Sequence, residues 1–420
     1  MAVQIRSEER PALALACGCY FLLLGSFYIL RPVRDTVATV LGTGRLQALF
    51  TAVFAVTLIA SPIYAALASR LTLQRLLPGV FWFWLFNVLV FAELFRWLPD
   101  NRWVVAAYYV WFSVVNLFMI SVFWSLMVDV FSAAQATRLF AWIAAGGEFG
   151  AIAGSLLTRA LVARLGLIGL LLLAAAGLLL VIGLIHLLMR AKQKLRASSE
   201  QAQQSTLDHR LAGNPFDGFS ELFKSPYARR QAVFMLLMTW VNTVAYYFQT
   251  DLVASSFQAI ASRTQVLADI DLVVNLCSAA ILIFGLGRLV QRFGVTAGLV
   301  LNPIIMVFAF LGLAISPSLF MIQLLQVVRR VAQYAIARPS REICFTVVEQ
   351  SSRYKAKNVI DTAVYRFGDL SSAWMQTGLR AAGFGFQGAI ALGIGASVAW
   401  GVVGSLLGRR YEQMRAKQAH

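Results

Sequence analysis

Apolar runs long enough to cross a bilayer recur along the whole chain, and this feature constrains the fold more than any other. A transmembrane helix needs about 20 mostly apolar residues to span ~30 Å of hydrocarbon. Only helices and closed barrels satisfy their backbone polar groups inside lipid, and the alternating pattern of barrel strands is absent here. The sequence therefore predicts an all-α polytopic membrane protein with twelve transmembrane helices. Their ranges are 12–35, 46–67, 76–96, 103–129, 139–163, 166–189, 231–253, 266–287, 295–315, 318–338, 357–382 and 388–408.

One long polar segment, 190–230, lies between the sixth and seventh predicted spans. It opens with a basic stretch and continues into NPFDGFSELFKSP, a composition that predicts a short amphipathic helix on the membrane surface. We therefore expect an N-terminal six-helix half at 1–189, a cytoplasmic linker at 190–230 and a C-terminal six-helix half at 231–420.

The lysines and arginines lie mostly between the spans and mostly on one side of this topology. The positive-inside rule then places both termini in the cytoplasm. It also accounts for the formal net charge of +17, so no nucleic acid partner is expected.

The two halves resemble each other. The stretches VDVFSAAQATRLFAWI, after span 4, and FTVVEQSSRYKAKNVI, after span 10, fall at equivalent places, and each opens the next helix. Two parallel six-helix repeats around a central cavity resemble the architecture of the major facilitator superfamily. That resemblance implies a carrier that works by alternating access.

Several predicted spans carry charges near their middles: Glu148, Arg329, Arg330, Arg366 and Asp369. A charge at the bilayer centre costs at least ~2.5–3.5 kcal/mol, so such groups pair or line a watery path. Neighbouring residues on a helix point ~100° apart, so one of Arg329 and Arg330 can face a substrate while the other pairs. Arg366 and Asp369 are spaced i,i+3, and the alternative for them is a buried structural pair.

A second cluster is RPVRD, which holds Arg31, Arg34 and Asp35 at the outer part of span 1. We expect Pro32 to interrupt the helix. An interrupted helix with flanking arginines predicts an anion site, because arginine binds phosphate and carboxylate with two parallel hydrogen bonds. The alternative is an ordinary outer loop.

For two further pairs of charged residues, the sequence leaves open whether they have a binding role. Arg341 and Glu342, at the inner end of span 10, are either binding residues or positive-inside charge. Asp269 and Asp271, near the outer end of span 8, are either interfacial or ion-linked.

No enzyme, metal or cofactor site is expected. The sequence has no Walker A lysine motif and no visible nucleophile with a base. The four cysteines match neither a disulfide framework nor a zinc site.

Three stretches resemble the bacterial branch of the ATP/ADP translocase family: ILRPVRDTV, SVFWSLMVDVFSAAQATRLFAWIAAGGEFGAIAGS and ARPSREICFTVVEQSSRYKAKNVIDTAVYRFGD. The resemblance implies a twelve-helix carrier for nucleotides in a bacterial inner membrane, with basic and acidic positions at Arg34, Asp35, Arg341 and Glu342. Two acidic positions of nucleotide exchangers are missing. They fall near Phe112, with Asn116 the nearest polar group, and near Ala245.

We therefore expect a secondary transporter, of the antiporter type, for an organic anion such as a phosphorylated metabolite or nucleotide. The alternatives are a lipid or drug carrier of the same fold and a non-transporting membrane receptor. The expected substrate-binding residues are Arg31, Arg34, Asp35, Asn116, Glu148, Arg329, Arg330, Arg341, Glu342, Arg366 and Asp369.

Overall fold

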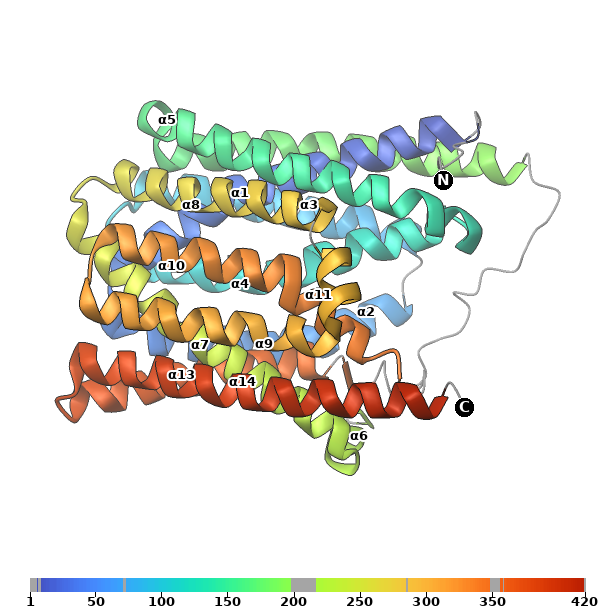
Figure 1. Cartoon of the computed structure of the whole chain (residues 1–420). Helices are drawn as coiled ribbons and strands as arrows, with labels where there is room; N and C mark the ends of the chain where they lie inside the picture. Colours follow the sequence, from blue (N-terminus) through green and yellow to red (C-terminus); the bar gives the residue numbers. More distant parts are fainter. Residues whose placement is uncertain are drawn as a thin grey trace. The chain divides into compact units, whose positions relative to one another are not determined.

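The computed structural model describes residues 6, 9–70, 73–197, 217–284, 286–347, 356–357 and 359–418. Within those ranges the chain forms helices and no strand (Figure 1). Eight of the described helices are long and apolar enough to cross a membrane. The prediction of an all-α polytopic membrane protein is confirmed.

Every predicted span falls largely on helical residues. The long helices are α1 (Arg10–Leu41), α2 (Leu46–Arg70), α3 (Leu73–Trp97), α4 (Arg102–Val130), α5 (Ala133–Ala197), α7 (Pro226–Ser256), α8 (Ile260–Phe284), α9 (Leu286–Ile315), α10 (Leu319–Ala332), α13 (Tyr365–Ala381) and α14 (Gly385–Gln418). The shorter elements are η2 (Thr43–Arg45), α6 (Asp217–Lys224), α11 (Arg338–Cys344) and two π-helical segments, η4 (Gln333–Ala337) and η5 (Ile360–Val364).

Local chemistry sets where the helices begin and bend. The Asn101 side chain caps α4 by accepting from the Trp103 and Val104 amides, and Ser225 and Ser318 cap α7 and α10 in the same way. Helix α5 contains two predicted spans, which meet at Gly166 with φ 62°. Gly294, with φ 77°, divides α9 similarly. Only glycine adopts such a positive φ without a steric penalty.

The chain divides into two compact units. Unit 1 comprises 1–37, 59–212 and 259–272, and unit 2 comprises 38–58, 213–258 and 273–420. Each unit thus includes one segment from the opposite half of the sequence. In unit 1, Thr264 of α8 lies 2.8 Å from Thr36 of α1. In unit 2, the Trp374 indole of α13 donates to Thr51 of α2 at 3.1 Å.

Close helix packing in unit 1 depends on glycine. A Cβ at Gly150 of α5 would lie 2.0 Å from the Phe21 carbonyl oxygen of α1, and one at Gly154 would lie 2.3 Å from that of Gly25. The two backbones therefore touch, as small residues repeated every four positions allow in membrane helices.

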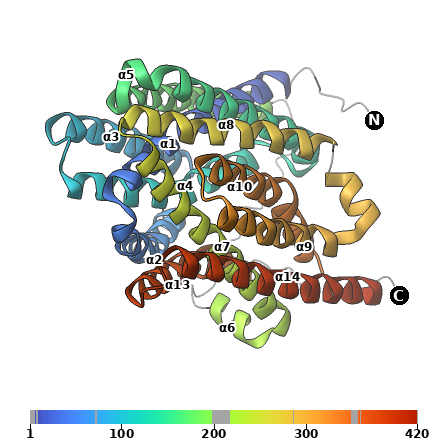
Figure 2. The ribbon, with the colours of Figure 1, turned by 60° about the vertical axis from the view of Figure 1, so that its left-hand side comes forward.

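The core of unit 2 is formed by α7, α9, α10 and α14 (Figure 2). The fully buried Trp400 ring packs edge-on against Phe234 with 5.6 Å between centroids. Helix α6 packs on α7 with Leu222 buried and Phe223 exposed, so the predicted short helix is present, and its place on the membrane surface stays a prediction. The basic stretch before it, 198–216, lies outside the described residues.

Candidate functional site

The RPVRD cluster lies inside a continuous helix, because α1 runs through Pro32 without a break. The expected interruption, and the alternative of an outer loop, are therefore wrong. Proline is tolerated in membrane helices where neighbouring helices re-satisfy the freed backbone groups. Since the helix is unbroken, Arg31 and Arg34 are one turn apart on the same side of α1.

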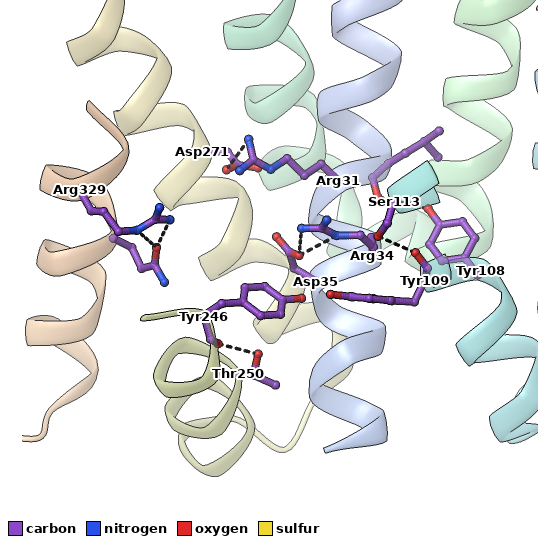
Figure 3. Close-up of polar contacts among 12 residues, drawn as sticks. Arg31, Arg34, Asp35, Tyr108, Tyr109, Ser113, Tyr246, Thr250, Asp271 and Arg329 are labelled. Atoms are coloured by element: carbon purple, nitrogen blue, oxygen red, sulfur yellow. Dashed lines mark hydrogen bonds and ion pairs between the residues drawn. The ribbon is translucent and has the colours of Figure 1, made fainter. Parts of the chain in front are cut away.

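Arg34 lies among aromatic rings within unit 1. Its Nε donates to Asp35 Oδ1 at 2.9 Å, and its guanidinium lies 5.5 Å from the Tyr109 ring centroid (Figure 3). The same guanidinium lies 5.9 Å from the Phe112 ring centroid. The Tyr108 hydroxyl of the same helix, α4, donates to the Leu30 carbonyl at 3.2 Å. This contact fixes α4 against α1 and holds the rings beside the arginine.

Arg31 pairs with a carboxylate from a distant part of the sequence. Its Nη1 lies 3.7 Å from Asp271 Oδ1 (Figure 3). Its guanidinium lies 5.5 Å from the Tyr28 ring centroid. The Arg31 side chain is 12% exposed and that of Asp271 is 2% exposed. Arg31 stands ten residues before the end of α1, about 15 Å along the helix at ~1.5 Å per residue.

Arg329 in unit 2 is surrounded by amide side chains. Its Nη2 donates to Gln326 Oε1 at 2.7 Å, and its Nη1 donates to Asn242 Oδ1 at 2.6 Å and to Gln333 Oε1 at 3.0 Å. Amide oxygens orient the guanidinium without carrying a formal charge of their own. The neighbouring Arg330 is also buried.

Arg366 and Asp369 form the expected i,i+3 pair, with 3.5 Å between Nη1 and Oδ2. Asp369 also accepts a hydrogen bond from Thr243 of α7 at 3.0 Å. Both charged side chains are buried. The pair therefore joins α13 to α7.

Arg341 and Glu342 belong to a cluster of ion pairs next to the π-helical segments. Arg341 Nη1 lies 2.8 Å from Asp361 and Nη2 lies 3.3 Å from Glu342, which Lys357 also contacts. Burial raises the pKa of the Glu342 carboxyl, but Lys357 and the nearby arginines together lower it below its usual value. Interruptions of this π-helical kind are frequent at functional sites.

Glu148 and Asn116 stand apart from these clusters. Both side chains are partly buried, on α5 and α4. Neither makes a hydrogen bond or an ion pair with another residue that the structure describes. The structure thus does not join them to the arginines.

Sequence reasoning missed the amide side chains around Arg329. Gln326 and Gln333 stand three residues before and four after it, a spacing that places them on its side of the helix. That signal was available in the sequence. Nothing in the sequence pointed to Asn242, which lies 87 residues away.

Buried arginines on helices that cross a membrane are typical of a multi-pass membrane transporter. The family model of the Major Facilitator Superfamily matches residues 16–328, and the chain belongs to this family. A search of the curated proteins gives no match.

Solved structures of transporters share the fold. A bacterial homologue of the human lysosomal transporter Spinster, inward-facing and unoccupied, is 15% identical, with a TM-score of 0.60 and 98% of each chain covered. A bacterial homologue of the iron transporter ferroportin, in the inward-facing state, is 13% identical, with a TM-score of 0.67 over 96% of this chain and 100% of that one. The nucleoside transporter NupG, in a mutant form, is 14% identical, with a TM-score of 0.56 over 96% of this chain and 99% of that one.

Proposed function

We propose that this protein is a secondary carrier that exchanges organic anions across a bacterial inner membrane by alternating access. Its substrate binds the two arginines of α1, Arg31 and Arg34, and carries an apolar portion as well as a negative group. Both termini face the cytoplasm in this proposal.

The observation that carries the proposal is the position of Arg34 over two aromatic rings. Contact with the Tyr109 and Phe112 rings, together with the bonds from Nε and Nη2 to Asp35, fixes the orientation of this guanidinium. A planar fork of this kind binds carboxylate or phosphate with two parallel hydrogen bonds. Arg31, one turn earlier, supplies a second cation on the same face of α1.

The apolar portion follows from Phe112. The resemblance to nucleotide exchangers places a carboxylate near this position, but here a buried ring faces Arg34 and stacks on Phe27 with 5.2 Å between centroids. A ring accommodates an apolar or planar part of a ligand, whereas a carboxylate repels an anion. The presence of a ring instead of an acid at this position favours an amphipathic anion as the substrate.

Arg329 is a candidate anion-binding cation within unit 2, taken by itself. Three amide neighbours hold the guanidinium in place. A fixed cation of this kind, on a helix of the membrane-spanning bundle, suits the recognition of an anion.

A thermal-shift screen of the purified protein against nucleotides, organic phosphates and lysolipids tests the proposal. We expect amphipathic anions to raise the melting temperature, and labelled versions of them to exchange across liposomes. Arg34→Ala should weaken binding at least about tenfold, equivalent to ~1.4 kcal/mol.

The matched control is Arg96→Ala, since Arg96 is 55% exposed and pairs only with its helical neighbour Glu93 among the contacts described. This variant should bind like the wild type. Stabilisation by uncharged lipids or drugs alone would instead support a lipid or drug carrier. Binding without any exchange would support a receptor.

A further inference from the structure

The first part of α8, residues 260–272, belongs to unit 1, although its sequence lies in the C-terminal half. Three of its side chains contact other helices of that unit. Thr264 contacts Thr36, Asp271 contacts Arg31, and Asp269 contacts Arg159.

Helical geometry gives these contacts two directions. Thr264 and Asp271 are seven residues apart, about two turns, so both face α1. Asp269 stands two residues before Asp271, about 200° round the helix, and its carboxylate lies 3.1 Å from Arg159 Nε of α5. The segment is therefore fastened to α1 by one face and to α5 by another.

The two ion pairs differ in burial. The side chains of Arg159 and Asp269 are 51% and 35% exposed, so this pair is only partly enclosed by protein. Asp271 is almost fully buried beside Arg31. Within the membrane-spanning bundle, neither charge of the Arg31–Asp271 pair can lose its partner without a substitute.

The separation of the Arg31–Asp271 pair leaves room for a better partner. Its 3.7 Å between Nη1 and Oδ1 exceeds the about 2.7–2.9 Å of a strong charge-assisted hydrogen bond. An incoming phosphate or carboxylate can engage Arg31 with two parallel bonds and replace the carboxylate. The displaced Asp271 then no longer holds residues 260–272 to α1 through Arg31, which weakens the attachment of this segment.

We propose that Asp271 is the resident counter-ion of Arg31, and that an organic anion bound to Arg31 displaces it and releases residues 260–272 from α1. Anion binding thereby controls the contact between α8 and the N-terminal helices. This inference rests on the proposed carrier function and assigns to Asp271 a competitive role in it.

The first test measures binding of phenyl phosphate, an anion with an apolar ring, to the full-length protein by calorimetry. Asp271→Asn removes the competing charge with little change of shape and should tighten binding about tenfold. Asp269→Asn, on the same segment but paired away from Arg31, should leave the affinity unchanged. Equal or weaker binding by Asp271→Asn would overturn the inference.

A second variant covers the case in which Asp271→Asn cannot be purified. Asp271→Glu keeps the carboxylate and extends its reach by one methylene, so it should pair more closely with Arg31 and weaken phenyl phosphate binding several-fold. Unchanged affinity in Asp271→Glu would contradict the competition.

The release of the segment is measured by the rate of cysteine labelling. A cysteine at the buried Thr264, in a background with the four native cysteines replaced, should react with a membrane-impermeant maleimide several-fold faster when Asp271→Asn is also present. Adding phenyl phosphate should accelerate labelling of the parent in the same way. Labelling that responds to neither change would count against release.

The outcomes separate this inference from the proposed function. If phenyl phosphate binds neither the wild type nor Asp271→Asn, and no other anion of the screen binds, the anion-carrier function fails and the inference fails with it. If the wild type binds and Asp271→Asn binds equally, the carrier function stands and the counter-ion role alone is refuted.

Discussion

The carboxylate of Glu9 meets both branches of the Arg138 guanidinium, with Nη2 at 2.8 Å from Oε1 and Nη1 at 3.4 Å from Oε2. The Arg6 amide and the Gln135 side chain also donate to it. The start of α1 is thereby fastened to the start of α5. Glu9 itself is only 3% exposed, so the loss of its charge should lower the stability of the fold.

The Glu9 pairing predicts a pH dependence of stability. Burial raises the pKa of Glu9, but the hydrogen bonds from Arg138, Arg6 and Gln135 together lower it below 4.5. A carboxyl whose pKa is lower in the folded state stabilises the fold above its unfolded pKa, and this contribution disappears as the pH falls through the folded value.

We therefore expect Glu9→Gln to lower stability by about 1 kcal/mol at pH 7. The difference from the wild type should vanish as the pH falls well below 4.5. Melting curves across this range measure it, with Glu93→Gln at an exposed i,i+3 pair as the control. A difference that persists at the lowest pH would refute the role of the charge.

The close contact between α1 and α5 predicts that one added methyl group lowers stability. Gly150→Ala would place Cβ 2.0 Å from the Phe21 carbonyl oxygen, so the backbones must separate. We expect a loss of at least about 1–3 kcal/mol, seen as a lower melting temperature and poor yield. Gly183→Ala on the same helix meets nothing within 4 Å and should be neutral or slightly stabilising. Similar behaviour of the two variants would show that the contact is looser.

The amide surroundings of Arg329 allow its charge to be neutralised without removing the side chain. Asn242→Asp keeps the shape of a side chain whose oxygen lies 2.6 Å from Nη1, but it adds a carboxylate. We expect anion binding to fall at least about tenfold, ~1.4 kcal/mol, because the new carboxylate occupies the cation. Asn242→Ala leaves the charge in place and should have a smaller effect. Calorimetry with the best anion of the screen measures this, and unchanged binding by Asn242→Asp would show that Arg329 does not bind the anion.

The two missing carboxylates predict that the protein exchanges nucleotides poorly. Phe112 faces Arg34, and Ala245 is fully buried, with its carbonyl accepting from Gln326 at 3.0 Å. Neither position offers an acid that would offset the positive charge of the arginines. Such an acid would help a site to release highly charged nucleotides. We therefore expect no robust exchange of external labelled ATP for internal ADP in liposomes. The positive control is exchange of the best anion of the screen in the same vesicles. Saturable ATP/ADP exchange would show that another acid, such as Glu148, serves instead.

The sequence alone determined the class of fold, because bilayer thickness and backbone hydrogen bonding leave few ways to arrange so many apolar runs. It also determined the i,i+3 pairing of Arg366 with Asp369, since this follows from the helical repeat. These features are local, and each depends on residues within a few turns of one helix.

Only the tertiary structure decided which charges meet across helices. Asp271 and Arg31 are 240 positions apart, and no spacing rule relates them. Pro32 looked like an interruption, yet α1 continues through it, since the packing of neighbouring helices outweighs the local preference. Asn242 reaches Arg329 only because α7 packs against α10. Periodicity fixes which residues share a face of a helix, but it does not fix which helix that face meets.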